Sequence, residues 1–165
     1  METILENKIE RAKELARARD ATAAARLADE LTTSHPEDIR VWILRGHLNE
    51  LFDDYAAAVK DLTRAMDLTS DEPHLFFTRG RYRFHLDDHE GALDDFASGL
   101  KLCDRLNNDY YREAFHFWRA ESFIRLGKLH DALQDLSHVG DDQRWWTYKL
   151  RTKQDLLRDC RFVES

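Results

Sequence analysis

Residues that interrupt helices are scarce in this sequence, and long apolar runs are absent. Only 2 prolines and 6 glycines occur among 165 residues, 35% of which are charged, and this composition favours helices over a sheet. No run of about 18 apolar residues could form a transmembrane helix, and residues 1–20 lack the apolar stretch of a secretory signal. We therefore expect an all-α, cytoplasmic protein that is not associated with a membrane.

Cysteine is also scarce, and basic residues are outnumbered by acidic ones. Cys103 and Cys160 have no C-x-x-C or zinc-ligand spacing, which argues against a disulfide framework and a zinc site. A formal net charge of −7 argues against a protein that binds nucleic acid mainly through phosphate contacts. Phosphate-binding, zinc-protease, serine-hydrolase and dinucleotide-binding motifs are missing from the sequence. We therefore predict no enzymatic activity, no catalytic residues, no metal and no cofactor.

What the sequence does contain is an internal repeat with a period of 34 residues. The stretch RGHLNELFDDYAAAVKDL, which begins at Arg45, returns as RGRYRFHLDDHEGALDDF at Arg79. With six residues inserted near Asn107, four units align, at 5–38, 39–72, 73–106 and 113–140. Matching positions are Asp20, Asp54 and Asp88; Ala24, Ala58, Ala92 and Ala132; and the small residues Ala12, Gly46, Gly80 and Ala120.

Each unit has the pattern of two antiparallel helices joined by a tight turn. In the second unit, Gly46 allows a neighbouring helix to approach, and Asp53 and Asp54 supply the turn and the N-cap. An apolar stripe follows at helical spacing, consisting of Tyr55, Ala58, Leu62, Ala65 and Leu68. One pair of helices cannot bury such a stripe, whereas about three or more stacked pairs can.

These features resemble the tetratricopeptide-repeat family, whose unit is a helix-turn-helix of 34 residues. The resemblance is carried by Trp42, Gly46, Tyr55, Ala58, Ala65, Leu68, Phe76, Gly80, Ala92 and Leu102, and by Pro36 at the end of the first unit. It implies an α-solenoid of about four units that forms a single domain over residues 1–165. The first unit departs from the pattern, because Lys8 stands where the family has an aromatic residue.

The segment after Gly140 is expected to form a capping helix over 142–161. Its apolar face would contain Trp146, Leu150, Leu157 and Cys160, and it would cover the open end of the stack. Alternatively, Trp145 and Trp146 form a hot spot that binds a partner. We favour burial of both, because aromatic residues at helical spacing are more often part of a core.

An arginine precedes the small residue of every unit, where the family usually has an apolar residue. Asp61, Asp95 and Asp135 follow the last three of these arginines by sixteen positions, whereas the first, Arg11, is followed by Leu27. We therefore predict one ion pair between the two helices of each later unit, namely Arg45 with Asp61, Arg79 with Asp95 and Arg119 with Asp135. The alternative is a ladder of arginines that binds a polyanion, which leaves the aspartates unexplained.

Acidic pairs and histidines suggest chemistry at first sight. Asp53-Asp54 and Asp87-Asp88 recur at the same place in successive units, so N-capping explains them better than catalysis does. His85 and His89 are four residues apart, as in some metal sites, but the repeat places a helix break between them. We therefore predict no metal site in this segment.

The resemblance implies that the first helix of each unit lines a concave groove that binds a partner. The candidate groove residues are Lys13, Arg40, Ile43, His47, Glu50, His74, Phe77, Arg81, Phe84, Phe117, Glu121 and Ile124. First helices of units two to four have a summed charge of +4, and the second helices have −7. A mildly basic, aromatic groove suits an extended peptide or loop, and the acidic outer wall suits a basic protein.

Two local features leave alternatives open. The six-residue insertion at 103–112 either lengthens the second helix of unit three or forms a protruding corner, with Tyr110 and Tyr111 packed or exposed. A family subgroup binds the C-terminal carboxylate of heat-shock chaperones, but the corresponding positions here hold Ile9, Lys13, Leu44, His74 and Thr78. Because Lys13 alone is basic in the expected sense, we reject that clamp.

We expect a non-catalytic module that binds one protein or peptide partner. One hypothesis is an immunity-type inhibitor whose acidic surface covers a basic toxin, and the alternative is a chaperone or adaptor that holds an extended segment in the groove. An RNA-binding helical repeat needs a continuous basic inner face, which Glu50 and Glu121 interrupt. Nothing in the sequence selects an oligomeric state.

Overall fold

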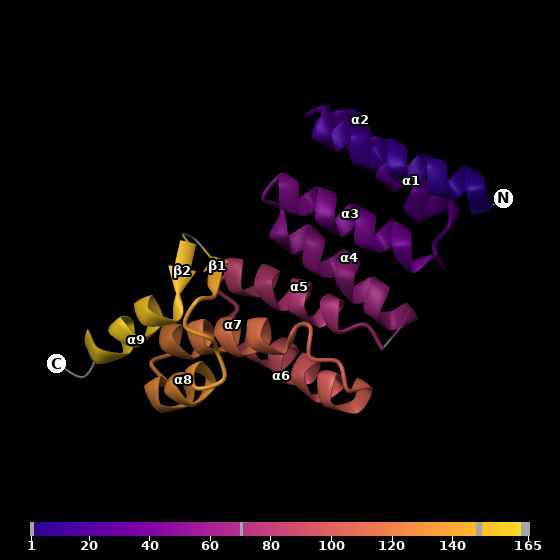
Figure 1. Cartoon of the computed structure of the whole chain (residues 1–165). Helices are drawn as coiled ribbons and strands as arrows, with labels where there is room; N and C mark the ends of the chain where they lie inside the picture. Colours follow the sequence, from indigo (N-terminus) through magenta and orange to yellow (C-terminus); the bar gives the residue numbers. More distant parts are fainter. Residues whose placement is uncertain (1, 70, 148–149, 163–165) are drawn as a thin grey trace. The chain divides into compact units, whose positions relative to one another are not determined.

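The computed structural model describes residues 2–69, 71–147 and 150–162, and helices dominate it (Figure 1). The expected all-α fold is confirmed. The chain forms two compact units, Met1–Ser70 and Asp71–Ser165, and each is described by itself. From here on, the first and second unit are these two parts of the chain, each of which contains two of the four sequence repeats. None of the described helices is long and apolar enough to cross a membrane.

The first unit consists of two helix pairs. Its elements are α1 (Glu2–Arg17), α2 (Ala21–Ser34), α3 (Ile39–Leu51) and α4 (Tyr55–Leu68). Alanines with no exposed surface, among them Ala12, Ala24 and Ala28, lie where α1 and α2 meet, so the two helices pack closely. Leu31, Val41 and Leu48 extend this core to α3.

The turns inside the helix pairs share one design, as the repeated acidic pairs predict. Asp53 and Asp87 adopt left-handed backbone conformations, with φ of 57° and 59°. The next residue in each turn then caps the following helix: the Asp54 carboxylate accepts a hydrogen bond from the Ala57 N–H at 3.0 Å, and Asp88 does the same for Gly91. The N-capping predicted for these acidic pairs is thus confirmed.

The second unit continues the helix pairs and ends in a different structure. Its helices and strands are α5 (Pro73–His85), α6 (His89–Leu106), α7 (Arg112–Arg125), α8 (Leu129–Leu136), β1 (Arg144–Trp146), β2 (Leu150–Thr152) and α9 (Lys153–Phe162). Two glycines allow aromatic rings to approach a helix backbone. A Cβ atom at Gly80 would overlap the ring of Phe96, and one at Gly99 would overlap the ring of Phe115.

The predicted capping helix over 142–161 is wrong in its first half. Strands β1 and β2 pair antiparallel there, with Trp145 opposite Arg151, and the helix begins only at Lys153. Thr152 fixes that start, because its Oγ accepts a hydrogen bond from the Asp155 N–H while its own N–H donates to the Asp155 carboxylate. The carboxylate of Asp155 accepts hydrogen bonds from both the N–H and the hydroxyl of Thr152, and these two bonds lower the pKa of Asp155. The expected burial of Trp146 concerns a side chain outside the described part of the structure.

The insertion at 103–112 lengthens α6 and also forms a corner. Helix α6 has 18 residues against 14 in α4, and Asn107 ends it in a left-handed conformation with φ of 50°. Tyr110 is 82% exposed, whereas Tyr111 packs against Phe77 with 5.5 Å between ring centroids. Of the two alternatives for these tyrosines, exposure is therefore correct for Tyr110 and packing is correct for Tyr111.

Candidate partner-binding groove

A groove with a volume of about 620 Å³ lies in the first unit, between the first helices of its two pairs. The residues that line it come from α1 and α3: Glu6, Ile9, Glu10, Lys13, Ala16, Arg17, Arg40, Ile43, Leu44, His47, Leu48 and Leu51. Ile9, Leu44 and Leu48 are buried and form an apolar floor. Leu51 is 64% exposed and adds an apolar side chain that solvent reaches.

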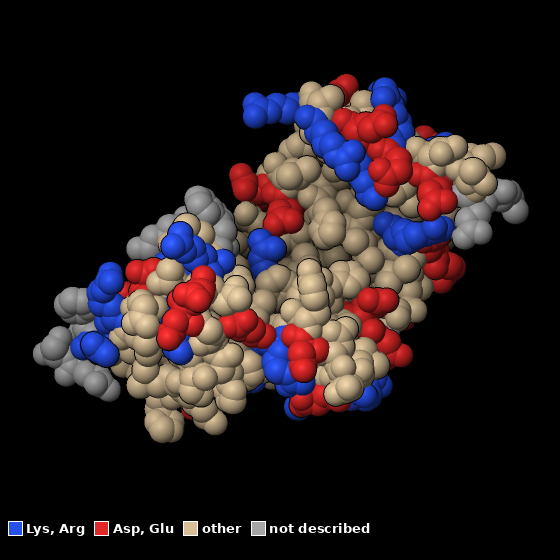
Figure 2. All heavy atoms as spheres, viewed as in Figure 1, with Lys and Arg blue, Asp and Glu red and all other residues tan. Residues whose placement is uncertain are grey.

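Helical spacing explains why these side chains share one face. On α1 the polar lining residues are Glu6, Glu10, Lys13 and Arg17, at intervals of four, three and four. Such intervals keep side chains on one side of a helix with 3.6 residues per turn. Figure 2 shows acidic and basic side chains interspersed over α1 and a mainly uncharged surface over α3.

Several charges of the groove are already paired within the chain. Lys13 Nζ donates to Glu10 Oε1 at 2.6 Å, and this hydrogen bond lowers the pKa of Glu10. Arg40 donates to both carboxylate oxygens of Asp38, at 3.0 Å and 2.7 Å, and thereby lowers the pKa of Asp38. The groove thus combines an apolar floor with charged edges that are largely neutralised.

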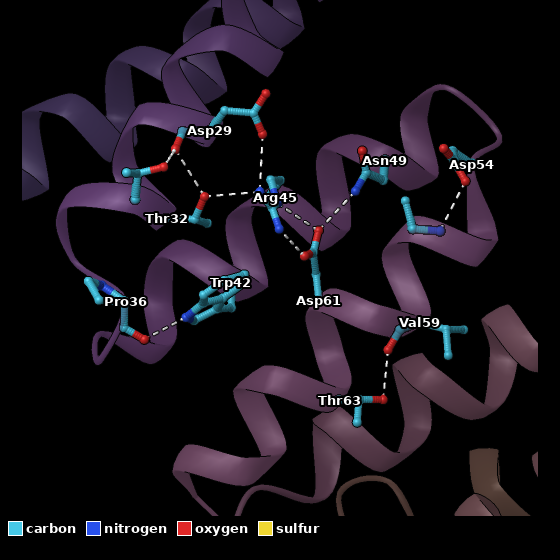
Figure 3. Close-up of polar contacts among 12 residues, drawn as sticks. Asp29, Thr32, Pro36, Trp42, Arg45, Asn49, Asp54, Val59, Asp61 and Thr63 are labelled. Atoms are coloured by element: carbon cyan, nitrogen blue, oxygen red, sulfur yellow. Dashed lines mark hydrogen bonds and ion pairs between the residues drawn. The ribbon is translucent and has the colours of Figure 1, made fainter.

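The position of α3 is fixed by a polar network around Arg45 (Figure 3). Its guanidinium donates to both oxygens of Asp61 on α4, at 3.0 Å and 2.6 Å, and to Asp29 and Thr32 on α2, at 3.1 Å and 3.0 Å. The bonds to Asp61 are the main reason that the pKa of Arg45 is raised. One side chain therefore holds three helices together, and with them one wall of the groove.

All three ion pairs predicted from the spacing of sixteen are confirmed. In addition to Arg45 with Asp61, Arg79 lies 2.6 Å from Asp95, and Arg119 lies 2.5 Å from Asp135. The side chains of the three aspartates are 2–5% exposed, so each is buried against its arginine. The arginines are thus structural, which removes the basis for a ladder that binds a polyanion.

Each buried aspartate also has a second donor that sequence reasoning missed. Asn49 donates to Asp61 at 2.9 Å, and Arg83 lies 3.1 Å from Asp95. These donors are equivalent in the repeat, 34 residues apart, which was the signal available in the sequence. In the last repeat, His116 is the second partner of the buried aspartate, with its Nδ1 atom 2.8 Å from Asp135. Burial raises the pKa of Asp135, but Arg119 and His116 together lower it below its usual value.

The charge difference between first and second helices shrinks once these pairs are recognised. Each pair removes one arginine from the first helices and one aspartate from the second helices, so +4 and −7 become +1 and −4. Much of the predicted contrast is therefore internal to the fold and is not presented to a partner.

Sequence reasoning placed part of the first unit's groove well. Lys13, Arg40, Ile43 and His47 line it, whereas Glu50 does not. Eight lining residues were not among the candidates: Glu6, Ile9, Glu10, Ala16, Arg17, Leu44, Leu48 and Leu51. Extending the α1 face by one helical turn in each direction from Lys13 would have found four of them, namely Ile9, Glu10, Ala16 and Arg17. Partner binding by the candidate residues stays a prediction.

In the second unit, four of the candidates are half-buried on α5 and α7, namely His74, Phe77, Arg81 and Ile124. The Arg81 guanidinium lies over the rings of Trp118 and Phe77, at 5.4 Å and 5.8 Å from their centroids. Phe77 also packs edge-on against Phe115, at 5.7 Å. These contacts make Phe77 and Arg81 part of an aromatic cluster, so substituting them would disturb packing as well as a surface.

Three candidates in the second unit are buried, which corrects the prediction that they face a partner. Phe84 has no exposed surface and packs edge-on against Trp118, at 5.4 Å. Phe117 is stacked on Trp145 of the hairpin, with 4.3 Å between ring centroids. Because the chain's own C-terminal segment covers this part of α7, sequence reasoning based on the repeat alone could not anticipate the burial.

Glu121 is the third buried candidate, with a side chain only 2% exposed. It lies 3.4 Å from Arg125 of its own helix and 3.5 Å from Arg151 of strand β2. Burial raises the pKa of Glu121, although both arginines act in the opposite direction. Its Oε2 atom forms no hydrogen bond with any described residue, so this carboxylate belongs to an imperfectly satisfied internal contact.

The histidines of the HLDDH stretch lie on different helices, as the repeat predicts. His85 ends α5 and His89 begins α6, with the Asp88 cap between them. Across the described residues, no group of three or more potential metal ligands comes together.

Comparison with known proteins relates the chain to several helical-repeat proteins. No family model matches the sequence. The chain is 30% identical over 129 residues to DnaJ homolog subfamily C member 3 of Gallus gallus, an alignment that covers 74% of this chain and 26% of that protein. The chain thus spans about a quarter of that relative's length.

Solved structures give a broader match at lower identity. The crystal structure of MamA protein aligns with a TM-score of 0.73 at 14% identity, over 84% of this chain and 72% of that one. The TPR2B domain of yeast Sti1, in complex with pHsp70, has a TM-score of 0.63 at 15% identity, covering 79% and 96%. YrrB, described as a TPR protein with an unusual peptide-binding site, has 0.66 at 16%, covering 79% and 64%. Similarity at this level of identity shows a shared fold.

Proposed function

We propose that this chain, a tetratricopeptide-repeat protein by its sequence repeat and its fold, is a non-catalytic module that binds one protein partner through the groove of its first unit. The partner would place a short apolar segment between α1 and α3, as a chaperone or adaptor requires. Of two proteins of similar fold, the Sti1 domain is described in complex with pHsp70, and YrrB is described with a peptide-binding site.

One observation carries the proposal: the groove has an accessible volume of about 620 Å³ over a floor of Ile9, Leu44 and Leu48. This volume is within the range of ligand-binding clefts, about 300–1,000 Å³. The exposed Leu51 at its edge is an apolar side chain that a partner would remove from water.

The rival hypothesis, an inhibitor that covers a basic toxin with its outer wall, has less support. Three of the acidic residues on that wall, Asp61, Asp95 and Asp135, are buried in internal ion pairs. The remaining outer charge of −4 is spread over three helices. An inhibitor of this kind would bind through exposed acids such as Asp94.

A pair of matched variants tests the proposal. Leu51 and Ile4 are each 64% exposed in the first unit, but only Leu51 lines the groove. We expect Leu51→Asp to weaken binding of a partner isolated with the wild-type protein by at least tenfold, because a desolvated charge replaces an apolar contact. Ile4→Asp should bind as the wild type does, within about twofold.

The measurement is isothermal titration calorimetry with the purified partner, after circular dichroism has shown that both variants are folded. Asp94→Lys on the outer face serves as the third variant. Loss of affinity in Asp94→Lys with normal affinity in Leu51→Asp would reject the groove and support the inhibitor hypothesis.

A further inference from the structure

The charges at the two ends of the groove are opposite in sign. Glu6 lies near the start of α1 and Arg17 in its last turn, and both line the groove. Between them, Glu10 and Lys13 form an ion pair with each other, and Arg40 is paired with Asp38. Among the described residues, neither Glu6 nor Arg17 takes part in an ion pair. Both groups can therefore meet a partner, and the charge of Arg17 also contributes to the lowered pKa of Glu10.

The spacing of these charges sets the length of the segment that would meet both. Glu6 and Arg17 are 11 positions apart on one face of a helix, which corresponds to about 16 Å. An extended chain advances about 3.3 Å per residue, so about five residues span that distance.

The volume of the groove accommodates an extended segment of this length. From strand and sheet spacings, an extended residue in a packed structure occupies about 160 Å³, so about 620 Å³ corresponds to about four residues. The length and the volume of the groove thus both fit a segment of four to five extended residues.

We infer that the groove between α1 and α3 recognises an extended segment of about five residues with an apolar centre, a basic residue at the Glu6 end and an acidic residue at the Arg17 end. The apolar centre would lie over Ile9, Leu44 and Leu48. This inference rests on the proposed function, to which it adds the chemistry and the charge order of the partner segment.

The test uses three synthetic peptides with blocked termini, so that only side chains contribute charge. Their sequences are Lys-Leu-Val-Leu-Asp, with mixed ends, Lys-Leu-Val-Leu-Lys, with basic ends, and Asp-Leu-Val-Leu-Asp, with acidic ends. Binding is followed by NMR titration of the backbone amides of the full-length protein at low salt, which measures weak affinities and shows where each peptide binds.

For the wild-type protein we expect the mixed-end peptide to bind about two- to fivefold more tightly than either of the others, the size of one exposed ion pair. Arg17→Glu should make the basic-end peptide the tightest, and Glu6→Lys should make the acidic-end peptide the tightest. The double variant should again prefer mixed ends. Salt at about 0.5 M should reduce every preference.

Arg11→Glu is the matched control, because Arg11 is an exposed arginine of α1 that does not line the groove. It should keep the wild-type order of the three peptides. Equal binding of all three peptides at α1 and α3, or an order that does not change in Arg17→Glu and Glu6→Lys, overturns the charge order while leaving the groove as a binding site. If no peptide shifts amides of α1 and α3, the proposed function fails as well.

Discussion

The buried ion pair between α5 and α6 gives the sharpest test of the structural argument. Asp95 has a side chain only 3% exposed and accepts hydrogen bonds from Arg79 at 3.0 Å and 2.6 Å, and Arg83 lies 3.1 Å away. Asp95→Asn would keep the shape of the side chain but remove its charge. Two arginines would then lie beside a neutral amide, with one of its two acceptor oxygens lost.

Breaking a buried pair from one side destabilises a protein by about 3–5 kcal/mol. We expect about 3 kcal/mol for Asp95→Asn, because the amide oxygen still accepts one hydrogen bond and the arginines, 14% and 24% exposed, are partly solvated. With a urea dependence of about 1.5 kcal/mol/M, the unfolding midpoint of the second unit should fall by about 2 M.

The assay is urea unfolding followed by hydrogen exchange and mass spectrometry, which resolves the second unit from the first and does not assume one transition for the whole chain. Asp94→Asn is the control, since Asp94 is the exposed neighbour on the same helix and should change stability by less than about 0.5 kcal/mol. If Asp95→Asn destabilises no more than Asp94→Asn, the pair does not hold the helices in register, and the spacing of sixteen does not mark a stabilising contact.

Two further predictions concern the packing of the second unit. Gly99→Ala should destabilise it by about 1–3 kcal/mol in the same urea assay, because the added methyl group would overlap the ring of Phe115; an unchanged midpoint would show that the ring moves freely. The raised pKa of Glu121 means that its contribution to stability is most favourable below the carboxyl's unfolded pKa and is lost as pH rises through the folded pKa. Glu121→Gln should therefore gain stability relative to the wild type between pH 4 and pH 7, and a difference that does not vary with pH would contradict the role of burial.

The sequence predicted the parts of the fold that repeat. The turns at Asp53 and Asp87 and the pairing of Arg79 with Asp95 recur at a fixed period, so one unit served as evidence for the next. Local chemistry of this kind is visible without a structure, because the partners lie within one helix pair.

Contacts that occur only once in the chain could not be predicted from the repeat, or their sequence signal was overlooked. The burial of Phe117 and Glu121 depends on a hairpin that has no counterpart in the other helix pairs, as far as their residues are described. The start of α9 was an overlooked signal, because Thr152 and Asp155 have the spacing of a capping box. Periodicity alone extended the helix through Trp145, where adjacent aromatic residues favour a strand.

The turns inside the four helix pairs are positions where the stability of the fold could be increased. Arg19, Asp53, Asp87 and Gly127 adopt left-handed backbone conformations at equivalent places, with φ between 57° and 71°, yet only the last is glycine. A side chain in that conformation costs roughly 1 kcal/mol, less for aspartate than for arginine. Exchange of these residues for glycine would alter no helix face. At these turns, a mutation to glycine can therefore offset destabilising mutations elsewhere in the chain. The sequence of the binding surface can then change without loss of the fold.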